Sequence, residues 1–341
     1  MSSDGRFDYT TRVTVLSRTI VYKQQTHPLY KEGPVALKVT ASRHSTDTAW
    51  HPSLHEANVY KLLGPHPSIP DFVECVEDWF DTDCFQACDA RAGRKCVPIL
   101  VIQFVKAVPL ERFLSSVCTI RWSVAMQILR QVVTVLEHVH SKGIVYRDLK
   151  LPNLILDRAG HVWLVDYASS IVVGSVDLAG DVTQHIGAPE LYRPLSLCDG
   201  ELSPPRLPFM TDFWAFGAFV LELLTCRPYL GSFSVRSFQL SQCELNEKVI
   251  EGVALAKVRY KGVFYDKKPK SNGCCSSKVL WESLTDLLMG LLQVNPADRL
   301  GYNGGWADVR GHSFMQNILT DAPTPFPEEY EDEVDELTLG L

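Results

Sequence analysis

One short stretch of the chain gathers the residue types that phosphoryl transfer requires. Asp148, Lys150 and Asn153 stand within six residues, and Asp166 follows thirteen positions after Asn153. A carboxylate can orient an acceptor hydroxyl, a lysine can neutralise a phosphate, and carboxylate and amide oxygens are ligands that Mg²⁺ accepts. The runs NLILD and HVWLVD flank a turn at 158–160, which predicts a β-hairpin that brings Asn153 and Asp166 to the same end. The stretch therefore predicts a site for ATP and Mg²⁺.

The part of the chain before this stretch is predicted to consist of strands and one helix. Residues 12–40 contain β-branched and alternating runs, and residues 73–80 and 98–105 are two further strand candidates. Residues 52–63 are predicted to form the helix. Its apolar side is expected to consist of Leu54, Ala57, Leu62 and Leu63.

The rest of the chain is predicted to be mainly helical. Residues 121–143 place valine and isoleucine at helical spacing, and residues 213–224 are apolar nearly all round, as in a buried helix. Two polar loops, 195–208 and 266–278, are predicted to be surface insertions. A small β-rich part followed by a larger helical part indicates an α+β fold.

The ordered series of motifs resembles the eukaryotic protein kinases. The segment YRDLKLPN at 146–153 resembles the catalytic-loop pattern H-R-D-x-x-x-x-N, and the triplet DYA at 166–168 stands where D-F-G is expected. The triplet at 188–190 matches A-P-E, and VALK at 35–38 matches the V-A-I-K strand. The resemblance implies the bilobal protein kinase fold, with a small β-rich N-lobe and a larger, mainly helical C-lobe. The implied divisions are an N-lobe and hinge at 1–105, a C-lobe at 106–318 and an acidic C-terminal tail at 319–341.

The resemblance also implies a role for each matching position. Asp148 is expected to be the catalytic base, Lys150 a phosphate contact, and Asn153 with Asp166 the magnesium ligands. Lys38 is expected to contact the α- and β-phosphates of ATP, and Glu56 to form its ion-pair partner. The adenine pocket is expected to contain Val21, Ala36, Ile155, the gatekeeper Ile102 and the hinge backbone of Gln103 and Val105.

The activation segment and its anchor are assigned by the same resemblance. In this family the arginine that precedes the catalytic base commonly binds a phosphate on the activation segment, and Arg147 stands in that place. Arg299 is expected to pair with Glu190, which ends the A-P-E triplet. Thr183 is preferred as the threonine near the catalytic loop, because this alignment leaves A-P-E intact. A rival alignment takes GAPELYRP as the whole G-T-P-E-Y-L-A-P stretch and puts Leu195 in the place of the glutamate.

Two features place the chain within the superfamily and one sets it apart. Tyr146 in the histidine place and the ending RLGYNGGWADVRGHSFM resemble the AGC group of serine/threonine kinases. The glycine-rich loop is lost, because residues 15–24 contain no glycine where backbone N–H groups usually approach phosphate closely. The favoured hypothesis is an ATP-dependent kinase that phosphorylates serine or threonine on protein substrates. The alternatives are a pseudokinase that acts as a scaffold or allosteric binding module, and a small-molecule kinase.

The net charge and the hydropathy of the chain limit the partners and the location that are expected. The net charge of −7 argues against nucleic acid, since phosphate binding usually needs a basic surplus. The sequence shows neither an apolar run of membrane-spanning length nor the apolar core of a secretory signal, so a cytoplasmic or nuclear location is expected. The expected partners are ATP, a protein substrate and a regulatory protein. The acidic run at 328–336 is expected to be a solvated tail.

Overall fold

A computed structural model shows how these elements are arranged. It describes residues 7, 9–15, 19–40, 51–81, 94–117, 119–174, 188–191, 207–226, 241–261, 277–319 and 324–339. The strands are β1 (Arg12–Val15), β2 (Thr19–Gln24), β3 (Val35–Thr40), β4 (Phe72–Asp81), β5 (Arg94–Gln103), β6 (Ala107–Pro109), β7 (Ile144–Val145), β8 (Leu154–Asp157), β9 (Val162–Leu164) and β10 (Ile171–Val172). The α-helices are α1 (Pro52–Leu63), α2 (Leu110–Val117), α3 (Trp122–Ser141), α4 (Met210–Thr225), α5 (Gln242–Arg259), α6 (Ser277–Leu291), α7 (Trp306–Gly311), α8 (Ser313–Leu319) and α9 (Glu328–Thr338). Short 3₁₀ turns lie at η2 (Leu151–Asn153), η3 (Pro189–Leu191), η5 (Leu207–Phe209) and η7 (Pro296–Asp298).

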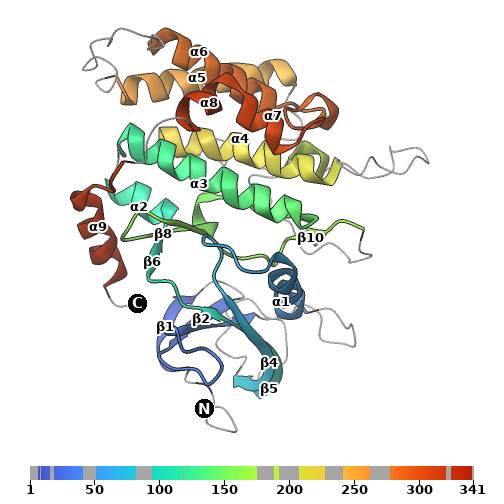
Figure 1. Ribbon diagram of the computed structural model, residues 1–341, viewed down its shortest axis with the longest axis vertical. Helices are drawn as coiled ribbons and strands as arrows, with labels where there is room; N and C mark the ends of the chain where they lie inside the picture. Colours follow the sequence, from blue (N-terminus) through green and yellow to red (C-terminus); the bar gives the residue numbers. More distant parts are fainter. Residues whose placement is uncertain are drawn as a thin grey trace.

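The molecule has two lobes, and the α+β kinase fold class is confirmed. Strands β1–β5 and α1 form the smaller lobe, and the helices from α2 to α8 form the larger one (Figure 1). The predicted hairpin is also present, because β8 pairs with β9 in antiparallel register. Gly160 takes a φ of 76° in its turn, a conformation that glycine adopts without strain.

The antiparallel sheet of the N-lobe positions one buried lysine. Its strand order is β1-β2-β3-β5-β4, so β3 lies in the middle of the sheet. All six residues of β3 are buried, and Lys38 is paired in register with Val21 of β2 and Leu100 of β5. A charge in a central, buried strand requires partners of opposite charge. The strand therefore directs Lys38 toward the carboxylates described below.

Helix α1 is where the sequence predicts it, but the predicted apolar side is partly wrong. Leu54 and Leu62 are 40% and 50% exposed. The buried side consists instead of Ser53, Glu56, Ala57, Val59, Tyr60 and Leu63. In this orientation α1 packs on the sheet with Glu56 facing Lys38, and the two leucines lie at the surface.

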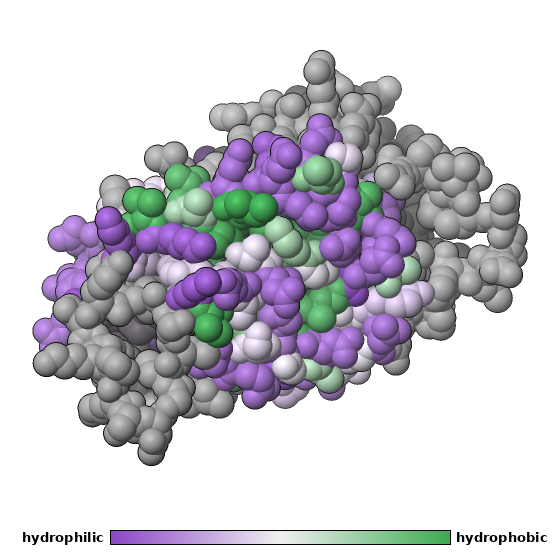
Figure 2. All heavy atoms as spheres, turned by 90° about the horizontal axis from the view of Figure 1, so that it is seen from above, coloured by the Kyte–Doolittle hydropathy of each residue, from purple (hydrophilic) through white to green (hydrophobic). Residues whose placement is uncertain are grey.

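The C-lobe is built around α4. All sixteen residues of α4 are buried, as its continuous apolar sequence predicts. Figure 2 looks onto the end of the molecule near α5, α6 and α8, where apolar side chains are interspersed among hydrophilic ones. No helix among the described residues is both long enough and apolar enough to cross a bilayer.

The acidic C-terminal run is not a solvated tail, so that prediction is wrong. It forms α9, which lies beside α2 and β6 (Figure 1). Tyr330 and Val334 are buried and four residues apart, so they lie on one side of α9, and Phe326, just before the helix, is buried in contact with Tyr330. The Tyr330 hydroxyl accepts a hydrogen bond of 3.0 Å from the backbone N–H of Arg121. The many acidic residues between these positions conceal the apolar period in the sequence.

Candidate active site

Lys38 connects three elements at the centre of the site. Its ammonium donates hydrogen bonds of 2.9 and 2.7 Å to the two carboxylate oxygens of Glu56 on α1. It also donates one of 2.7 Å to Oδ1 of Asp166, which follows β9. The backbone N–H of Tyr167 donates to Oε1 of Glu56 at 3.0 Å. Sheet, helix and the DYA triplet are thereby held in one charge cluster.

Lys38 and Asp166 stabilise each other's charges, whereas burial, together with the charge of Asp166, raises the pKa of Glu56. Burial disfavours the ammonium of Lys38, but the carboxylates of Asp166 and Glu56 outweigh that effect and raise the pKa of Lys38 above its ordinary value. Burial acts against the carboxylate of Asp166 as well, yet Lys38 holds its pKa below the ordinary value. Both side chains are therefore ionised at neutral pH.

The catalytic-loop residues form a second group. Asp148 is 8% exposed and accepts hydrogen bonds of 3.1 and 2.8 Å from Lys150. The amide nitrogen of Asn153 donates to the backbone carbonyl of Asp148 at 3.0 Å and to its Oδ2 at 2.8 Å. The structure thus brings together the three residues that the sequence predicts, and two neighbours fix the orientation of the Asp148 carboxylate.

Asp212, at the start of α4, holds the backbone of this loop. Its Oδ2 accepts from the N–H of Tyr146 and its Oδ1 from the N–H of Arg147, both at 2.7 Å. Arg147 has a φ of 68°, a strained value for a residue other than glycine. His140 lies 2.7 Å from Oδ2 of the same carboxylate and contacts Trp306. Sequence reasoning missed this role, because nothing in the local sequence distinguishes Asp212 from Glu222, the other buried acidic residue of α4.

A column of aromatic rings, which was not predicted from the sequence, connects the Lys38 cluster to the catalytic loop. The ring of Tyr167 lies 5.3 Å from that of Tyr146 and 5.0 Å from that of Tyr60 on α1. Tyr60 in turn stacks on Phe72 of β4, with 6.4 Å between ring centroids. The hydroxyl of Tyr146 donates to the carbonyl of Val165 at 2.6 Å, and that of Tyr167 to Leu164 at 3.3 Å. Tyrosine therefore fits the histidine and phenylalanine places, because each added hydroxyl has an acceptor.

Replacement of the D-F-G glycine by Ala168 is tolerated by the backbone. Among the described residues, the non-glycine positions with positive φ are Arg147, Asp166 and Cys226. Ala168 is absent from that set, so its side chain imposes no left-handed strain there. Asp166 instead has a φ of 65°, which aims its carboxylate at Lys38.

The four residues whose side chains are predicted to surround adenine lie on strands. Ala36 and the gatekeeper Ile102 are paired in register on β3 and β5, and Val21 packs against the same core. Ile155 lies on β8, paired with Pro109. Val21, Ala36 and Ile102 thus belong to the sheet of the N-lobe, and Ile155 belongs to the sheet formed by β6, β8 and β9.

The hinge is tied down on either side. The backbone N–H of Gln103 donates to the carbonyl of Asp71 at 2.8 Å, and the side-chain oxygen of Gln103 accepts from the N–H of Asp71 at 3.2 Å. The backbone N–H of Phe104 donates to the carbonyl of Pro34 at 3.0 Å. Within the described part of the chain, the backbone N–H of Val105 has no hydrogen-bond partner. An adenine edge can occupy that position.

The donor set suits magnesium held jointly with a nucleotide. The described residues include no group of three or more histidine, cysteine, aspartate or glutamate side chains suited to a metal ion. Mg²⁺ commonly takes one or two protein ligands and completes its shell with phosphate oxygens and water. Asp166 supplies a carboxylate, and the amide oxygen of Asn153 remains on the side opposite its bonds to Asp148. The residues present fit the group.

The A-P-E glutamate is anchored as the preferred alignment requires. Arg299 forms two hydrogen bonds with Glu190, at 2.7 and 3.1 Å, and its guanidinium lies 5.1 Å from the Trp214 ring. This geometry favours Glu190 over Leu195, which lies outside the described residues. Thr183 lies outside them as well.

Comparison with known proteins agrees with this geometry. The family model described as the protein kinase domain matches residues 21–315. The serine/threonine-protein kinase RUNKEL of Arabidopsis thaliana is 28% identical over 284 residues, which cover 82% of this chain and 17% of that protein. SCH9 of Saccharomyces cerevisiae, also a serine/threonine-protein kinase, is 29% identical over 213 residues, 61% of this chain and 22% of that protein. The atypical protein kinase C of Drosophila melanogaster is 30% identical over 193 residues, 55% of this chain and 27% of that protein.

These relatives are much longer, since the matched regions span between 17% and 27% of their lengths. The chain therefore matches only a part of each of these relatives. The predicted resemblance to serine/threonine kinases of AGC type is confirmed, and the chain belongs to the eukaryotic protein kinase family.

Proposed function

We propose that this chain is an active kinase that transfers the γ-phosphate of ATP to serine or threonine of protein substrates. The observation that supports this most strongly is the bonding of Lys38 to both Glu56 and Asp166. A buried cluster of one cation and two anions is costly to desolvate, and apolar residues of similar volume often stabilise a fold at least as well. A scaffold has no need of such a cluster, whereas a phosphate-binding site does.

The chemistry follows from the two groups of residues. ATP would supply the transferable phosphoryl group, and Asp166 and Asn153 are the residues that would hold Mg²⁺ with it. Lys38 neutralises phosphate charge, with Glu56 fixing its position. Asp148 accepts a hydrogen bond from the acceptor hydroxyl and aims its oxygen at the γ-phosphorus. As the new O–P bond forms and the bond from γ-phosphorus to the bridging oxygen breaks, Asp148 takes the hydroxyl proton and ADP leaves.

Lys150 places a positive charge beside Asp148 during this transfer. It lies 2.8 Å from Oδ2 of Asp148, so its charge is close to the position of the transferred group. The lysine can offset negative charge there. This arrangement leaves Asp148 as an oriented acceptor.

Binding of Mg-ATP and transfer to a mixed library of serine, threonine and tyrosine peptides test the proposal. Asp148→Asn and Lys38→Met are the test variants, and Asp332→Asn and Lys142→Met, at exposed positions, are the controls. We expect serine and threonine peptides to be phosphorylated by wild type and both controls, with loss in both test variants. Binding of ATP without transfer would support the pseudokinase instead.

The pseudokinase remains the second candidate because of one feature. Residues 15–24 contain no glycine, and 16–18, which connect β1 to β2, lie outside the described residues. Fewer backbone N–H groups near the phosphates would weaken nucleotide binding. A dissociation constant for Mg-ATP far above millimolar, measured by titration calorimetry, would favour this alternative.

Arg147 bears on regulation of the proposed activity. One of its terminal guanidinium nitrogens, Nη1, is buried and has no hydrogen-bond partner among the described residues. An unpartnered guanidinium nitrogen is suited to an anionic group. We infer that an acidic or phosphorylated residue of the activation segment binds there, which phosphopeptide mapping of the active protein can test.

A further inference from the structure

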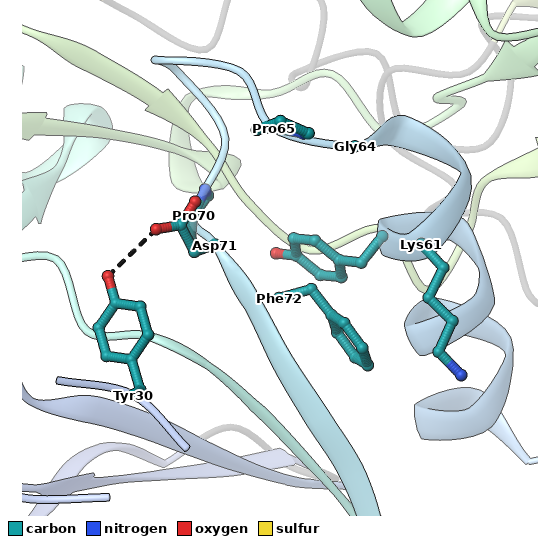
Figure 3. Close-up of a pocket in the computed structure, with 8 residues that line it drawn as sticks. Tyr30, Lys61, Gly64, Pro65, Pro70, Asp71 and Phe72 are labelled. Carbon is teal, nitrogen blue, oxygen red and sulfur yellow. Dashed lines mark hydrogen bonds between the residues drawn. The ribbon is translucent and has the colours of Figure 1, made fainter. Parts of the chain in front are cut away.

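A pocket of about 400 Å³ lies in the N-lobe and shares none of its lining with the residues assigned to ATP or catalysis. It is formed by Tyr30 from the loop before β3, by Tyr60 and Lys61 at the end of α1, and by Pro70, Asp71 and Phe72 where β4 begins. Figure 3 shows Tyr30 and Asp71 on one side, Lys61 on α1 on the other, and Phe72 between them. Its size is that of a site for a small molecule.

Tyr60 presents an unexplained polar group at this pocket. The residue is 3% exposed, and its hydroxyl has no hydrogen-bond partner among the described residues. Less than 1 Å² of this oxygen is exposed, so bulk water does not replace the missing partner. A buried hydroxyl without a partner costs about 1–3 kcal/mol. Phenylalanine would fill the same space in the aromatic column without that cost, so the hydroxyl calls for a further explanation.

The lining indicates which ligand would satisfy it. Tyr30, Phe72 and Pro70 provide flat apolar walls suited to an aromatic ring. Asp71, which accepts a hydrogen bond of 3.1 Å from the Tyr30 hydroxyl, and the ammonium of Lys61 carry opposite charges. A neutral ligand is therefore favoured over a charged one. Its single polar group would pair with the hydroxyl of Tyr60.

Lys61 is the lining side chain that can give way to such a ligand. It is exposed, and its ammonium lies 5.5 Å from the centroid of the Phe72 ring, a weak contact at the protein surface. Side-chain rotation on ligand binding is common even where the backbone does not move. Rotation of Lys61 away from Phe72 widens the pocket on the α1 side.

Tyr60 connects this pocket to the active site. It lies four residues after Glu56 on α1, so both project from one side of the helix. Its ring contacts that of Tyr167, whose backbone N–H binds Glu56. A ligand that fixes Tyr60 therefore also fixes the partner of Lys38.

We propose that this pocket binds a small, neutral aromatic molecule with one hydrogen-bonding group, which bonds to Tyr60 and stabilises the position of α1. Binding itself does not depend on the proposed kinase activity. The effect of the bound ligand on nucleotide affinity, in contrast, rests on the proposed function.

The test uses p-cresol, which has a ring and a hydroxyl, and toluene, which lacks the hydroxyl. Ligand-observed NMR titration to about 10 mM suits the affinity that ligands of this size can reach. Tyr60→Phe removes only the hydroxyl, and Tyr260→Phe is the matched control, because Tyr260 also has a buried hydroxyl without a partner in the described structure and lies outside the pocket. We expect saturable binding of p-cresol that weakens about fivefold in Tyr60→Phe and is unchanged in Tyr260→Phe, as loss of one hydrogen bond predicts. Toluene should bind both variants as it binds wild type.

Absence of saturable p-cresol binding, or equal binding by Tyr60→Phe, overturns the site. A second titration measures Mg-ATP affinity with and without p-cresol, and we expect it to be about fivefold tighter with p-cresol in wild type only. An unchanged nucleotide affinity overturns the coupling. If p-cresol binds as expected but Mg-ATP does not bind at all, the kinase proposal fails and the pocket stands.

Discussion

The ammonium of Lys38 lies 2.7 Å from a carboxylate oxygen of Asp166, although 128 positions separate them in the chain. This contact joins the central strand of the N-lobe to the segment that follows β9. It can form only when the two lobes are closed to this distance, so the structure shows the protein with the charged site assembled. The predictions below concern what holds this arrangement in place.

Glu56→Gln should lower phosphoryl transfer strongly while leaving the fold intact. The amide retains the shape of the side chain and an acceptor for Tyr167, but it removes the negative charge that fixes Lys38. Misplacement of a reacting group by about 1 Å can reduce the rate about 100-fold, and we expect a decrease of that order in kcat with peptide substrate. Glu137→Gln on α3, whose partner is Arg310, is the control and should be active. A Glu56→Gln protein with wild-type kcat would show that the ion pair is not needed.

Arg299→Met should destabilise the C-lobe. The side chain is fully buried, and the change leaves Glu190 without the partner that now lies 2.7 Å away. Breaking a buried ion pair from one side costs about 3–5 kcal/mol. Because Glu190 is 21% exposed, water relieves part of this, and we expect about 3 kcal/mol from urea denaturation.

Arg158→Met provides the comparison for that measurement. Arg158 pairs with Glu331 and Asp335, but its side chain is 59% exposed. Exposed pairs contribute about 0–1 kcal/mol, so this variant should unfold close to wild type. Equal losses in the two variants would contradict the role given to burial.

The sequence predicted the residues of the site better than the contacts that hold them. Lys38, Asp148 and Asp166 are recognisable because charges interrupt apolar strands or stand at fixed spacing in one loop. Asp212 and Tyr60 have no such local signal. Their roles depend on neighbours 66 and 107 positions away, Tyr146 and Tyr167, and only the folded chain brings these together.

The errors have a physical cause as well. A helical wheel for 52–63 favours the side with the most leucine, but α1 buries Glu56 because Lys38 needs a carboxylate. In the C-terminal run, acidic residues outnumber the apolar ones, so net charge outweighed the four-residue period of Phe326, Tyr330 and Val334. The spacing of a few large apolar side chains therefore predicts the packing of a helix better than its overall composition does.

Gly160→Ala should detach α9 from the C-lobe. Glycine is needed at this position for two reasons, a φ of 76° and the close approach of the Phe326 ring, which a Cβ atom would overlap. The left-handed conformation alone costs a residue such as alanine about 1–2 kcal/mol. We expect a larger loss of stability here, together with faster amide hydrogen exchange throughout α9.

Gly143→Ala separates the effect of backbone strain from the effect of the overlap with Phe326. Gly143 has a φ of 71°, but a Cβ atom there would have open space around it. This variant should show only the strain of about 1–2 kcal/mol, with unchanged exchange in α9. Fast exchange of α9 in both variants would mean that general destabilisation, rather than the contact with Phe326, releases the helix.

Glu222 should make the protein less stable as pH rises from about 4.5 to about 7. This residue of α4 is 3% exposed, and burial, assisted by the charge of Glu111, raises its pKa from 4.5 to about 7. In this range the unfolded chain releases the proton while the folded protein keeps it, so the free energy of unfolding decreases with pH and levels off above about 7. A shift of this size corresponds to about 3 kcal/mol. Glu222→Gln preserves shape and cannot ionise, so it should match wild type at about pH 4 and exceed it by about 3 kcal/mol at about pH 8 in urea denaturation. A constant difference between the two proteins at both pH values would show that folding does not shift the pKa of Glu222.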